Sequence, residues 1–415
     1  MTLIKTSILS GISTIIRVIT GFISVKLVAV YIGPSGLAFM GQMQSFIAMM
    51  SAIASAGVNS GVIKYTAEHY ENENIKQKIW STALKISLVL IIPVAGIIIF
   101  LADFISLKIF NTANYSSIFI IFAITIIFFV LNALLTSILN GQKEIKKLTL
   151  LNIIGSIFSL VTTVILVIQF KLYGALIAGI ISQSIVFFIT LYFVIHSKWF
   201  TISMFTSKMD SEYTNKLLKF ALMSLVSAIT IPLSHIYIRN YIGNNIGWDE
   251  AGYWQAIWRI SETYLMLITV TLSVYYLPKL SSIENKKELK NELIYVYKVV
   301  MPIVVIMALC IYIFKEQIVN ILFTKSFSPM IELFLYQLIG DILKIASWLL
   351  GYIMVAKAMV KLYVFTELFF ITSFVVFTIF FISIYGLIGV TIAFMVNYLL
   401  YLFFLYFSLK GFFNE

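Results

Sequence analysis

The stretch from Tyr31 to Gln44 reads YIGPSGLAFMGQMQ and forms a glycine-rich turn between two long apolar runs. A degenerate copy, YIGNNIGWDEAGYWQ, begins 210 residues later at Tyr241. Further landmarks repeat in the same order at offsets of 210 to 216: Lys64 with Lys279, Lys143 with Lys357, Lys147 with Lys361, and Tyr173-Gly174 with Tyr385-Gly386. Ordered repetition at one spacing indicates a duplicated half.

The composition places the chain in a membrane. Of its 415 residues, 61% are hydrophobic and only 11% are charged, whereas a soluble domain has roughly 25% charged residues. The net charge of +11 does not indicate nucleic acid, because the basic residues are scattered between apolar runs. That distribution is typical of a topology signal.

Apolar runs of about 20 residues can cross a bilayer as helices, and the chain contains twelve. They cover residues 7–31, 36–65, 79–102, 114–140, 148–170, 174–195, 216–240, 250–277, 293–314, 329–356, 360–383 and 386–409. We therefore expect an all-α polytopic membrane protein with two parallel-repeat six-helix bundles. The bundles are expected at 1–195 and 215–415, joined by a cytoplasmic linker at 196–214.

The basic residues of the connections predict the orientation. Of the 29 lysines and arginines, 17 lie at the termini and in even-numbered loops, and 5 lie in odd-numbered loops. Because positive charge accumulates on the cytoplasmic side, both termini are predicted to be cytoplasmic.

Several chemistries have no sequence signature. There is one cysteine, Cys310, and there are three histidines, with no Walker A sequence, no HExxH and no cluster of metal ligands. The loops are too short for an enzyme domain. We expect no cofactor, no metal, no nucleic-acid partner and no enzymatic activity.

Cations within the first-half runs are candidates for substrate binding, because a charge at the bilayer centre costs about 2.5–3.5 kcal/mol or more. Arg17 lies in mid-run on a stripe with Ser13 and Ser24. Lys26 is roughly 180° away on an ideal helix, so a bend near Gly21 is needed to aim both at one cavity; otherwise Lys26 reaches the surface. Gln42 and Lys64 are predicted to share a face of the second run.

The second half adds Arg239, Gln255 and Arg259 as candidate binding residues. Pro232 is expected to bend the helix that carries Arg239.

Acids in the second half are candidates for coupling or gating. The i, i+3 spacing allows Glu262 to pair with Arg259, and Asp341 with Lys344. The remaining candidate acid is Glu367. Proton exchange at these carboxylates competes with export driven by the membrane potential.

Five stretches carry a resemblance to a known family: LVAVYIGPSGL (27–37), GVIKYTAEHY (61–70), WDEAGYWQ (248–255), SVYYLPKLS (273–281) and QLIGDILKIASWLLGYIMVAKA (337–358). With them, the chain resembles the Wzx-type lipid-linked polysaccharide flippases of the multidrug/oligosaccharidyl-lipid/polysaccharide exporter (MOP) superfamily. Within that family it is similar to the branch that handles O-antigen and the lipid III of enterobacterial common antigen.

The resemblance implies a flippase of the bacterial inner membrane. Two bundles around a central cavity would move an undecaprenyl-diphosphate-linked oligosaccharide to the periplasmic leaflet by alternating access. Arg17, Lys26 and Lys64 would then meet the diphosphate, whereas the family motif does not require a basic residue at Arg259. Besides membrane lipids, the polysaccharide polymerase and the chain-length machinery would be partners in lipopolysaccharide biosynthesis.

Two other functions compete with this interpretation. A multidrug or cation exporter of the same superfamily should carry unpaired acids inside the membrane, but the first half here carries cations. A membrane glycosyltransferase or ligase should have a large external loop, and the chain has none.

Overall fold

The computed structural model describes residues 3–414, and every regular element in that range is a helix. Nine helices of the described chain are long and apolar enough to cross a membrane. One of the nine, α7 (Ile145–Ile195), folds back at Lys171 and supplies a second crossing. The broken helix α8 (Ser211–Asn245) and the less apolar helix α9 (Trp248–Thr271) complete the predicted twelve. The all-α polytopic fold is confirmed.

Both halves follow one order of elements. The first half comprises α1 (Leu3–Tyr31), α2 (Pro34–Ala54), α3 (Asn59–Glu68), α4 (Glu73–Phe100), α5 (Ala102–Phe110), the 3₁₀ turn η1 (Ala113–Tyr115), α6 (Ser116–Gly141) and α7. After the 3₁₀ turn η2 (Ile202–Phe205), the second half comprises α8, α9, the π-helical turn η3 (Leu272–Tyr276), α10 (Leu277–Ser282), α11 (Lys286–Ile313), α12 (Lys315–Leu322), the 3₁₀ segment η4 (Lys325–Leu333), α13 (Phe334–Ala356), α14 (Val360–Tyr385) and α15 (Ile388–Asn414).

The backbone repeats with the sequence. Left-handed residues recur 214 or 215 positions apart: Gly33 (φ 82°) with Gly247 (φ 155°), Lys143 (φ 59°) with Ala358 (φ 51°), and Lys171 (φ 47°) with Gly386 (φ 58°). The helices α4 and α11 both start at an asparagine cap, Asn72 and Asn285, whose side chain accepts a hydrogen bond from the first turn. The duplication is therefore present in the turns as well as in the spans.

This regular offset corrects two of the letter matches. Tyr241 and Gly243 lie inside α8, so the structural counterpart of Gly33 is Gly247. Likewise, Gly174 corresponds to Gly389 rather than to Gly386. Similar letters had shifted the alignment by four residues at the YIG copies, because α8 extends further past its YIG than α1 does, and by three residues at Gly174.

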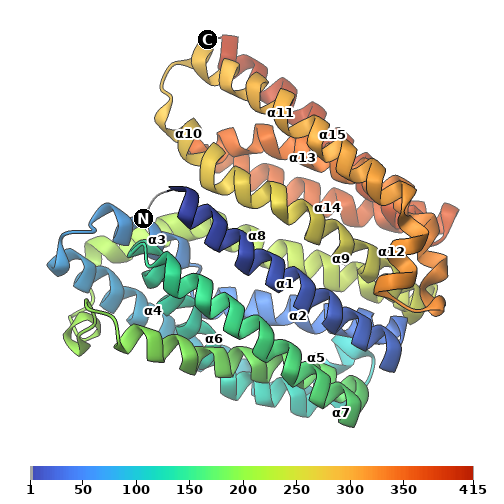
Figure 1. The fold of residues 1–415 in the computed structure, drawn as a ribbon, viewed down its shortest axis with the longest axis horizontal. Helices are drawn as coiled ribbons and strands as arrows, with labels where there is room; N and C mark the ends of the chain where they lie inside the picture. The colour runs from blue at the N-terminus through green and yellow to red at the C-terminus, as the bar shows by residue number, and fades with distance from the viewer. Residues whose placement is uncertain (1–2, 415) are drawn as a thin grey trace. The chain divides into compact units, whose positions relative to one another are not determined.

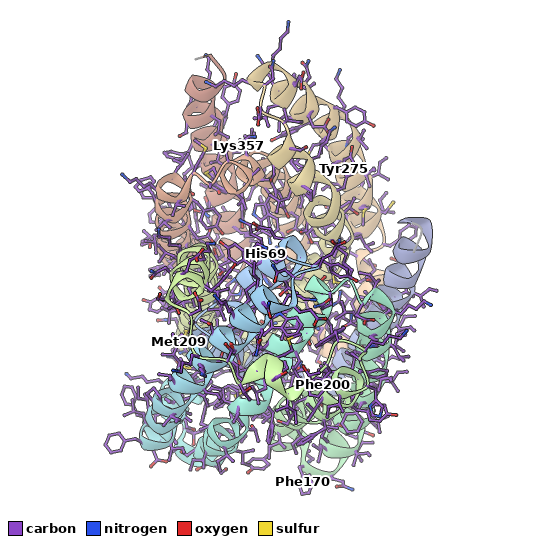
Figure 2. The ribbon with its side chains drawn as sticks, turned by 90° about the vertical axis from the view of Figure 1, so that its left-hand side faces the viewer. His69, Phe170, Phe200, Met209, Tyr275 and Lys357 are labelled. Carbon is purple, nitrogen blue, oxygen red and sulfur yellow. The ribbon has the colours of Figure 1, made fainter. Side chains whose placement is uncertain are left out.

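A close backbone approach identifies the matched glycines. A Cβ atom on Gly174 would lie 1.9 Å from the carbonyl oxygen of Leu166, and one on Gly389 would lie 2.3 Å from that of Phe381. In both halves a hairpin thus folds tightly enough to require glycine. Phe170, next to the turn at Lys171, lies at the edge of the first unit in Figure 2.

The predicted run 36–65 is not one helix. It breaks between α2 and α3, where Ala56 and Gly57 have φ of 50° and 62°. At the matching place in the second half, the chain continues through the π turn η3 instead. The break changes which residues share a face, so the predicted common face of Gln42 and Lys64 is wrong.

The chain forms two compact units. The first ends at Ile32, resumes at Phe39 and extends to Ile236; the second contains Gly33–Ala38 and everything from Tyr237 onward. In the first unit, α7 packs on α1 and α6, and in the second, α13 packs on α11 and α15 (Figure 1). Edge-to-face pairs such as Phe46 with Phe119 fill the first core, at 5.0 Å between ring centroids.

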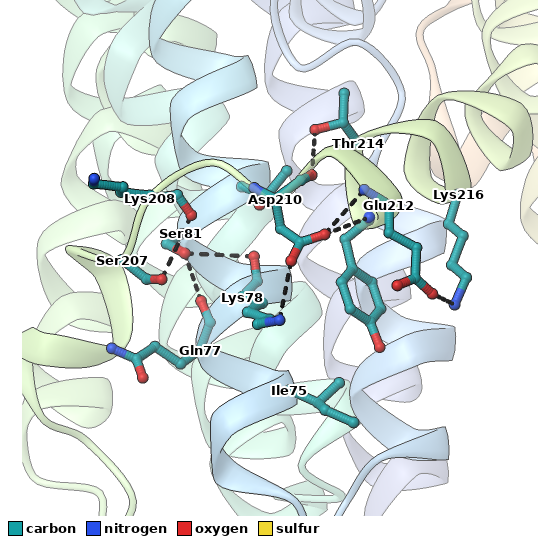
Figure 3. Close-up of polar contacts among 12 residues, drawn as sticks. Ile75, Gln77, Lys78, Ser81, Ser207, Lys208, Asp210, Glu212, Thr214 and Lys216 are labelled. Atoms are coloured by element: carbon teal, nitrogen blue, oxygen red, sulfur yellow. Dashed lines mark hydrogen bonds and ion pairs between the residues drawn. The ribbon is translucent and has the colours of Figure 1, made fainter.

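The segment after α7 is docked on the first unit (Figure 3). Four contacts attach it to α4: Gln77 Nε2 donates to the Ser203 carbonyl (2.7 Å), Lys85 Nζ to the Ser207 carbonyl (2.7 Å), Asp210 N to Thr82 Oγ1 (3.0 Å), and Lys78 Nζ forms an ion pair with Asp210 Oδ2 (3.1 Å). The ring of Trp199 also packs edge-on against Trp80, at 5.1 Å between centroids. The predicted tether is thus held along its length.

The bend in α8 lies before the expected position. Its segments Ser211–Lys219 and Ser224–Asn245 meet at 43°, N-terminal to Pro232. The bend of 43° is thus a feature separate from Pro232, and the expectation that Pro232 bends this helix stays a prediction.

Candidate functional site

Arg17 lies on a polar face of α1. Four exposed isoleucines follow another face of the helix: Ile12, Ile15, Ile19 and Ile23. At 100° per residue, Arg17 is roughly 120–160° away from each of them, yet it is exposed too. Ser13 and Thr20, which flank Arg17 on its own face, are buried. The isoleucine face suits lipid tails, and the charge of Arg17 lies on a different face of the same helix.

Lys26 is half-buried on the side of α1 away from Arg17. The helix runs without interruption through Gly21, so the bend that would aim both cations in one direction is absent. The structure therefore does not bring Arg17 and Lys26 together.

Gln42 and Lys64 have different surroundings. Gln42 is buried in α2, where its Nε2 donates to the Ile236 carbonyl of α8 at 3.3 Å. Lys64 is exposed on α3, and its Nζ lies 5.2 Å from the centroid of the Tyr65 ring. Gln42 therefore has a packing role, and Lys64 keeps an accessible charge.

The second unit brings Arg239 and Gln255 together. Arg239 is 2% exposed, and its Nη1 donates to Gln255 Oε1 at 2.6 Å. Its guanidinium also lies 5.9 Å from the centroid of the Trp254 ring. A hydrogen bond and an aromatic ring thus replace part of the hydration of this buried cation.

Asp341 lies at the centre of α13 with no exposed surface. The Tyr264 hydroxyl donates to its Oδ2 at 2.9 Å, and Gln337 Nε2 reaches its Oδ1 at 3.4 Å. Tyr264 comes from α9, so this carboxylate links two helices of the unit.

Lys344, one turn after Asp341, lies among aromatic rings. The centroids of four rings are within 6.0 Å of its Nζ: Trp258 (5.2 Å), Trp348 (4.9 Å), Phe394 (5.9 Å) and Tyr398 (6.0 Å). These rings come from α9, α13 and α15 and stabilise the ammonium by cation–π attraction.

The two expected ion pairs are absent from the described chain. Glu262 accepts a hydrogen bond from Trp258 Nε1 at 2.8 Å and acts electrostatically on Arg239 and Lys344. Arg259 is half-buried on the same helix. Lys344 acts on Asp341 from beyond ion-pair distance. Glu262 and Lys344 therefore have aromatic partners where the i, i+3 spacing predicted oppositely charged ones.

Glu367 is half-buried in α14 and acts electrostatically on Tyr398 and Tyr401 of α15. Through Tyr398, which also borders Lys344, it lies at the margin of the same charged interior. We call the set Arg239, Gln255, Glu262, Asp341 and Lys344 the second-unit polar cluster.

Aromatic partners were missing from the candidate list. Trp258 could have been found, because it lies four residues before Glu262 on the same helix face. Tyr264 had no local signal, since its partner Asp341 is 77 residues away.

Comparison with known proteins identifies a family and two relatives of this chain. The family described as polysaccharide biosynthesis protein matches residues 10–332. The chain is similar to the lipid III flippases of Escherichia coli (strain K12) and Shigella flexneri, with 28% identity to each over 401 residues, covering 97% of this chain and 96% of each relative.

The fold also has a solved counterpart. The structure described as the inward-facing conformation of a multidrug resistance MATE family transporter of the MOP superfamily matches with a TM-score of 0.79 and 16% identity, covering 95% of both chains. At that identity the likeness shows the fold alone. The family match covers well over half of the sequence, and the chain therefore belongs to the polysaccharide biosynthesis protein family.

Proposed function

We propose that this protein is a flippase that moves a lipid-linked oligosaccharide across the bacterial inner membrane. The observation that carries the proposal is the similarity to lipid III flippases over 97% of the chain. Twelve crossings in two repeated halves suit alternating access, in which each half contributes one wall. The function is transport, without a catalytic step.

The substrate class follows from the relatives and from the cations. An undecaprenyl-diphosphate headgroup carries about two negative charges, and an exposed cation on an apolar helix favours such a ligand. Arg17 and Lys64 are two of the exposed cations of the first unit and are proposed to contact the diphosphate. Lys26, Gln42, Arg239, Gln255 and Arg259 remain secondary candidates.

The second-unit polar cluster is proposed to couple or gate transport, together with Glu367. Its charges are held by hydrogen bonds and rings, so a change in one protonation state would alter several contacts at once. Drug export is the weaker alternative, because the likeness to the MATE transporter concerns the fold alone.

The remaining proposals concern placement and partners. Both termini are proposed to be cytoplasmic, with functional halves at 1–195 and 215–415 and a linker at 196–214. The counterpart relation between α1 and α8 supports that division. The polysaccharide polymerase and the chain-length machinery are proposed partners, for O-antigen or for common antigen.

Complementation tests the function. The chain is expressed in one strain that lacks its lipid III flippase and in another that lacks its O-antigen flippase. Restored common antigen or O-antigen would support the proposal and identify the sugar class. Restoration of neither, with normal amounts of protein in the membrane, would contradict it.

Two variants then test the site. Arg17→Ala and Lys64→Ala should each abolish complementation while the protein reaches the membrane at normal levels. Lys108→Ala, which removes an exposed cation from α5, is the matched control and should complement fully. Full activity of both test variants would remove these residues from the proposed site.

A further inference from the structure

Three side chains that can donate hydrogen bonds, Lys76, Gln142 and Lys143, lie near the meeting point of α3, α4 and the turn after α6. Lys76 is only 4% exposed, and its ammonium lies 5.7 Å from the Tyr70 ring centroid and 5.9 Å from that of Trp80. Within residues 11–410, no hydrogen bond or ion pair to this ammonium is formed. The Nζ is not among the fully buried atoms without a partner, so the ammonium meets solvent at its tip while rings cover the rest of the side chain.

The second donor is Gln142, which is 6% exposed. Its buried Nε2 has no hydrogen-bond partner in the described structure. It belongs to the same junction, because a Cβ atom on the preceding Gly141 would lie 2.5 Å from Thr66 Cβ, and Thr66 accepts a hydrogen bond from Trp80 Nε1 at 2.9 Å. An orphan amide donor of this kind indicates an acceptor that binds from outside.

Lys143 adds a second charge. Its Nζ lies 5.1 Å from the centroid of the Tyr70 ring, the ring that also borders Lys76. Two ammonium groups around one ring repel each other. Glu71 and Glu73, on either side of Asn72, are exposed and form no ion pair with these lysines in the described chain. Glu144, next to Lys143, pairs with Lys147 at 3.4 Å instead. Two lysines beside one ring and a buried amide donor form a set that favours an anion with several oxygen acceptors.

We propose that Lys76, Gln142 and Lys143 bind the phosphate group of a membrane lipid, with Tyr70 beside it. The site lies at the end of two apolar spans, α4 and α6, which is the level of the headgroups in a bilayer. A phosphate accepts several charge-assisted hydrogen bonds at once. The site includes none of the residues proposed to bind the transported substrate. A response to phosphatidylglycerol would make it a separate lipid site, and a response to prenyl diphosphate alone would join it to the proposed function.

Ligand-dependent stability tests the site on the full-length protein in detergent, since a ligand that binds the folded state raises Tm. Four probes are titrated: a short-chain phosphatidylglycerol, the diacylglycerol with the same chains, inorganic phosphate, and a short-chain prenyl diphosphate. The variants are Lys76→Gln, Lys143→Gln and Gln142→Leu. Lys146→Gln, which removes an exposed lysine three residues further on, is the matched control.

We expect a saturable rise in Tm with phosphatidylglycerol and none with diacylglycerol. Lys143→Gln and Gln142→Leu should weaken the apparent affinity roughly tenfold, as expected for loss of one hydrogen bond to a charged group, and Lys146→Gln should not. Gln142→Leu leaves both lysines in place and removes an amide whose Nε2 has no partner, so it keeps the test valid even if Lys76→Gln fails to fold. A rise with prenyl diphosphate instead of phosphatidylglycerol would still support a lipid-phosphate site and would identify its lipid as an isoprenoid.

Three results would overturn the proposal. One is an equal rise with inorganic phosphate, which would identify a free-anion site. Another is unchanged affinity in both Lys143→Gln and Gln142→Leu. The third is an equal loss in Lys146→Gln, which would reduce the effect to general surface charge.

Discussion

A carboxylate without solvent contact needs hydrogen-bond donors, and Asp341 finds its shorter one in Tyr264, at 2.9 Å. Another donor, Gln337, lies one turn earlier on α13, at 3.4 Å. The tyrosine therefore provides the better-formed bond, and it comes from a different helix. Its contribution is to the stability of the second unit and is separable from any role in coupling.

Tyr264→Phe should lower the free energy of unfolding by about 1.5–3 kcal/mol, the usual contribution of a hydrogen bond to a charged group. Thermal unfolding of the purified protein measures the change. Tyr275→Phe, which alters an exposed tyrosine nearby on η3, is the control and should leave Tm unchanged. Equal effects of the two substitutions would contradict the contribution assigned to Tyr264.

Asp210 gives the docked segment a dependence on pH. The backbone N–H of Tyr213 and then the ammonium of Lys78 hold the pKa of Asp210 below its ordinary value of 3.8. A carboxyl whose pKa is lowered by folding stabilises the folded state above its ordinary pKa, and this contribution disappears as the pH falls through the lowered value.

Asp210→Asn should therefore lower Tm at neutral pH, with a difference from the wild type that is constant above about pH 4 and closes at more acidic pH. Unfolding curves recorded across that range measure the difference. Asp103→Asn, which removes an exposed carboxylate with no hydrogen bond or ion pair in the described chain, should show no such closure. A difference that grows on acidification would reverse the assigned sign.

At the scale of single residues, the sequence located charges better than it located their partners. The sequence identified four polar residues inside apolar runs: Arg239, Gln255, Asp341 and Lys344. It did not identify their contacts. The i, i+3 spacing suggested ion pairs for Glu262 and Asp341, whereas Trp258 donates to Glu262 and Tyr264 donates to Asp341. Spacing on one helix cannot reveal a partner on another.

At the scale of elements, the hairpins after Leu166 and Phe381 depend on the absence of a side chain. The clash of a Cβ at Gly174 or Gly389 would be with a backbone carbonyl, which cannot rotate away as a flexible side chain can. The tight turn therefore requires glycine at these two positions.

Gly174→Ala and Gly389→Ala should each destabilise the protein by about 1–3 kcal/mol or more, as overpacking does. Gly179→Ala is a matched control on the same leg of α7, because its Cβ would meet nothing within 4 Å. It should be neutral or stabilise by up to about 1 kcal/mol through helix propensity. Equal Tm values for Gly174→Ala and Gly179→Ala would rule out the close approach.

Element types were predictable and their interruptions were not. Apolar length reveals a crossing, but α2 ends at Ala54 through a backbone conformation at Ala56 and Gly57 that no hydrophobic pattern marks. The same holds for the short helices α5 and α12, which were expected to be connections. Hydropathy averages over such breaks.

At the scale of the whole molecule, the distribution of basic residues predicts the side of the membrane on which each loop lies. Asn244 at the end of α8 should be external, and Glu284 before α11 cytoplasmic, and both are exposed. In a Cys310→Ser background, Asn244→Cys should react with an impermeant thiol reagent in intact cells. Glu284→Cys should react only after the cells are opened. The reverse pattern would invert the topology.

The duplication could be recognised from a few matched letters, although its register could not. Lysine pairs such as Lys64 with Lys279, in the short helices α3 and α10, gave the offset that the turns confirm. The YIG letters misled, since α1 and α8 end at different distances from them. The assignment of binding residues still depends on the proposed experiments.

The turn in α7 has a consequence for protein engineering. Lys171 adopts φ 47° and ψ −124°, the geometry of the first central residue of a type II′ turn, which glycine adopts without strain. The second half has glycine at the matching position, Gly386 (φ 58°, ψ −141°). A residue with a side chain costs of order 1–3 kcal/mol in such a conformation. Lys171→Gly should therefore stabilise the protein, because it gives the first half the residue that the second half already has at this turn.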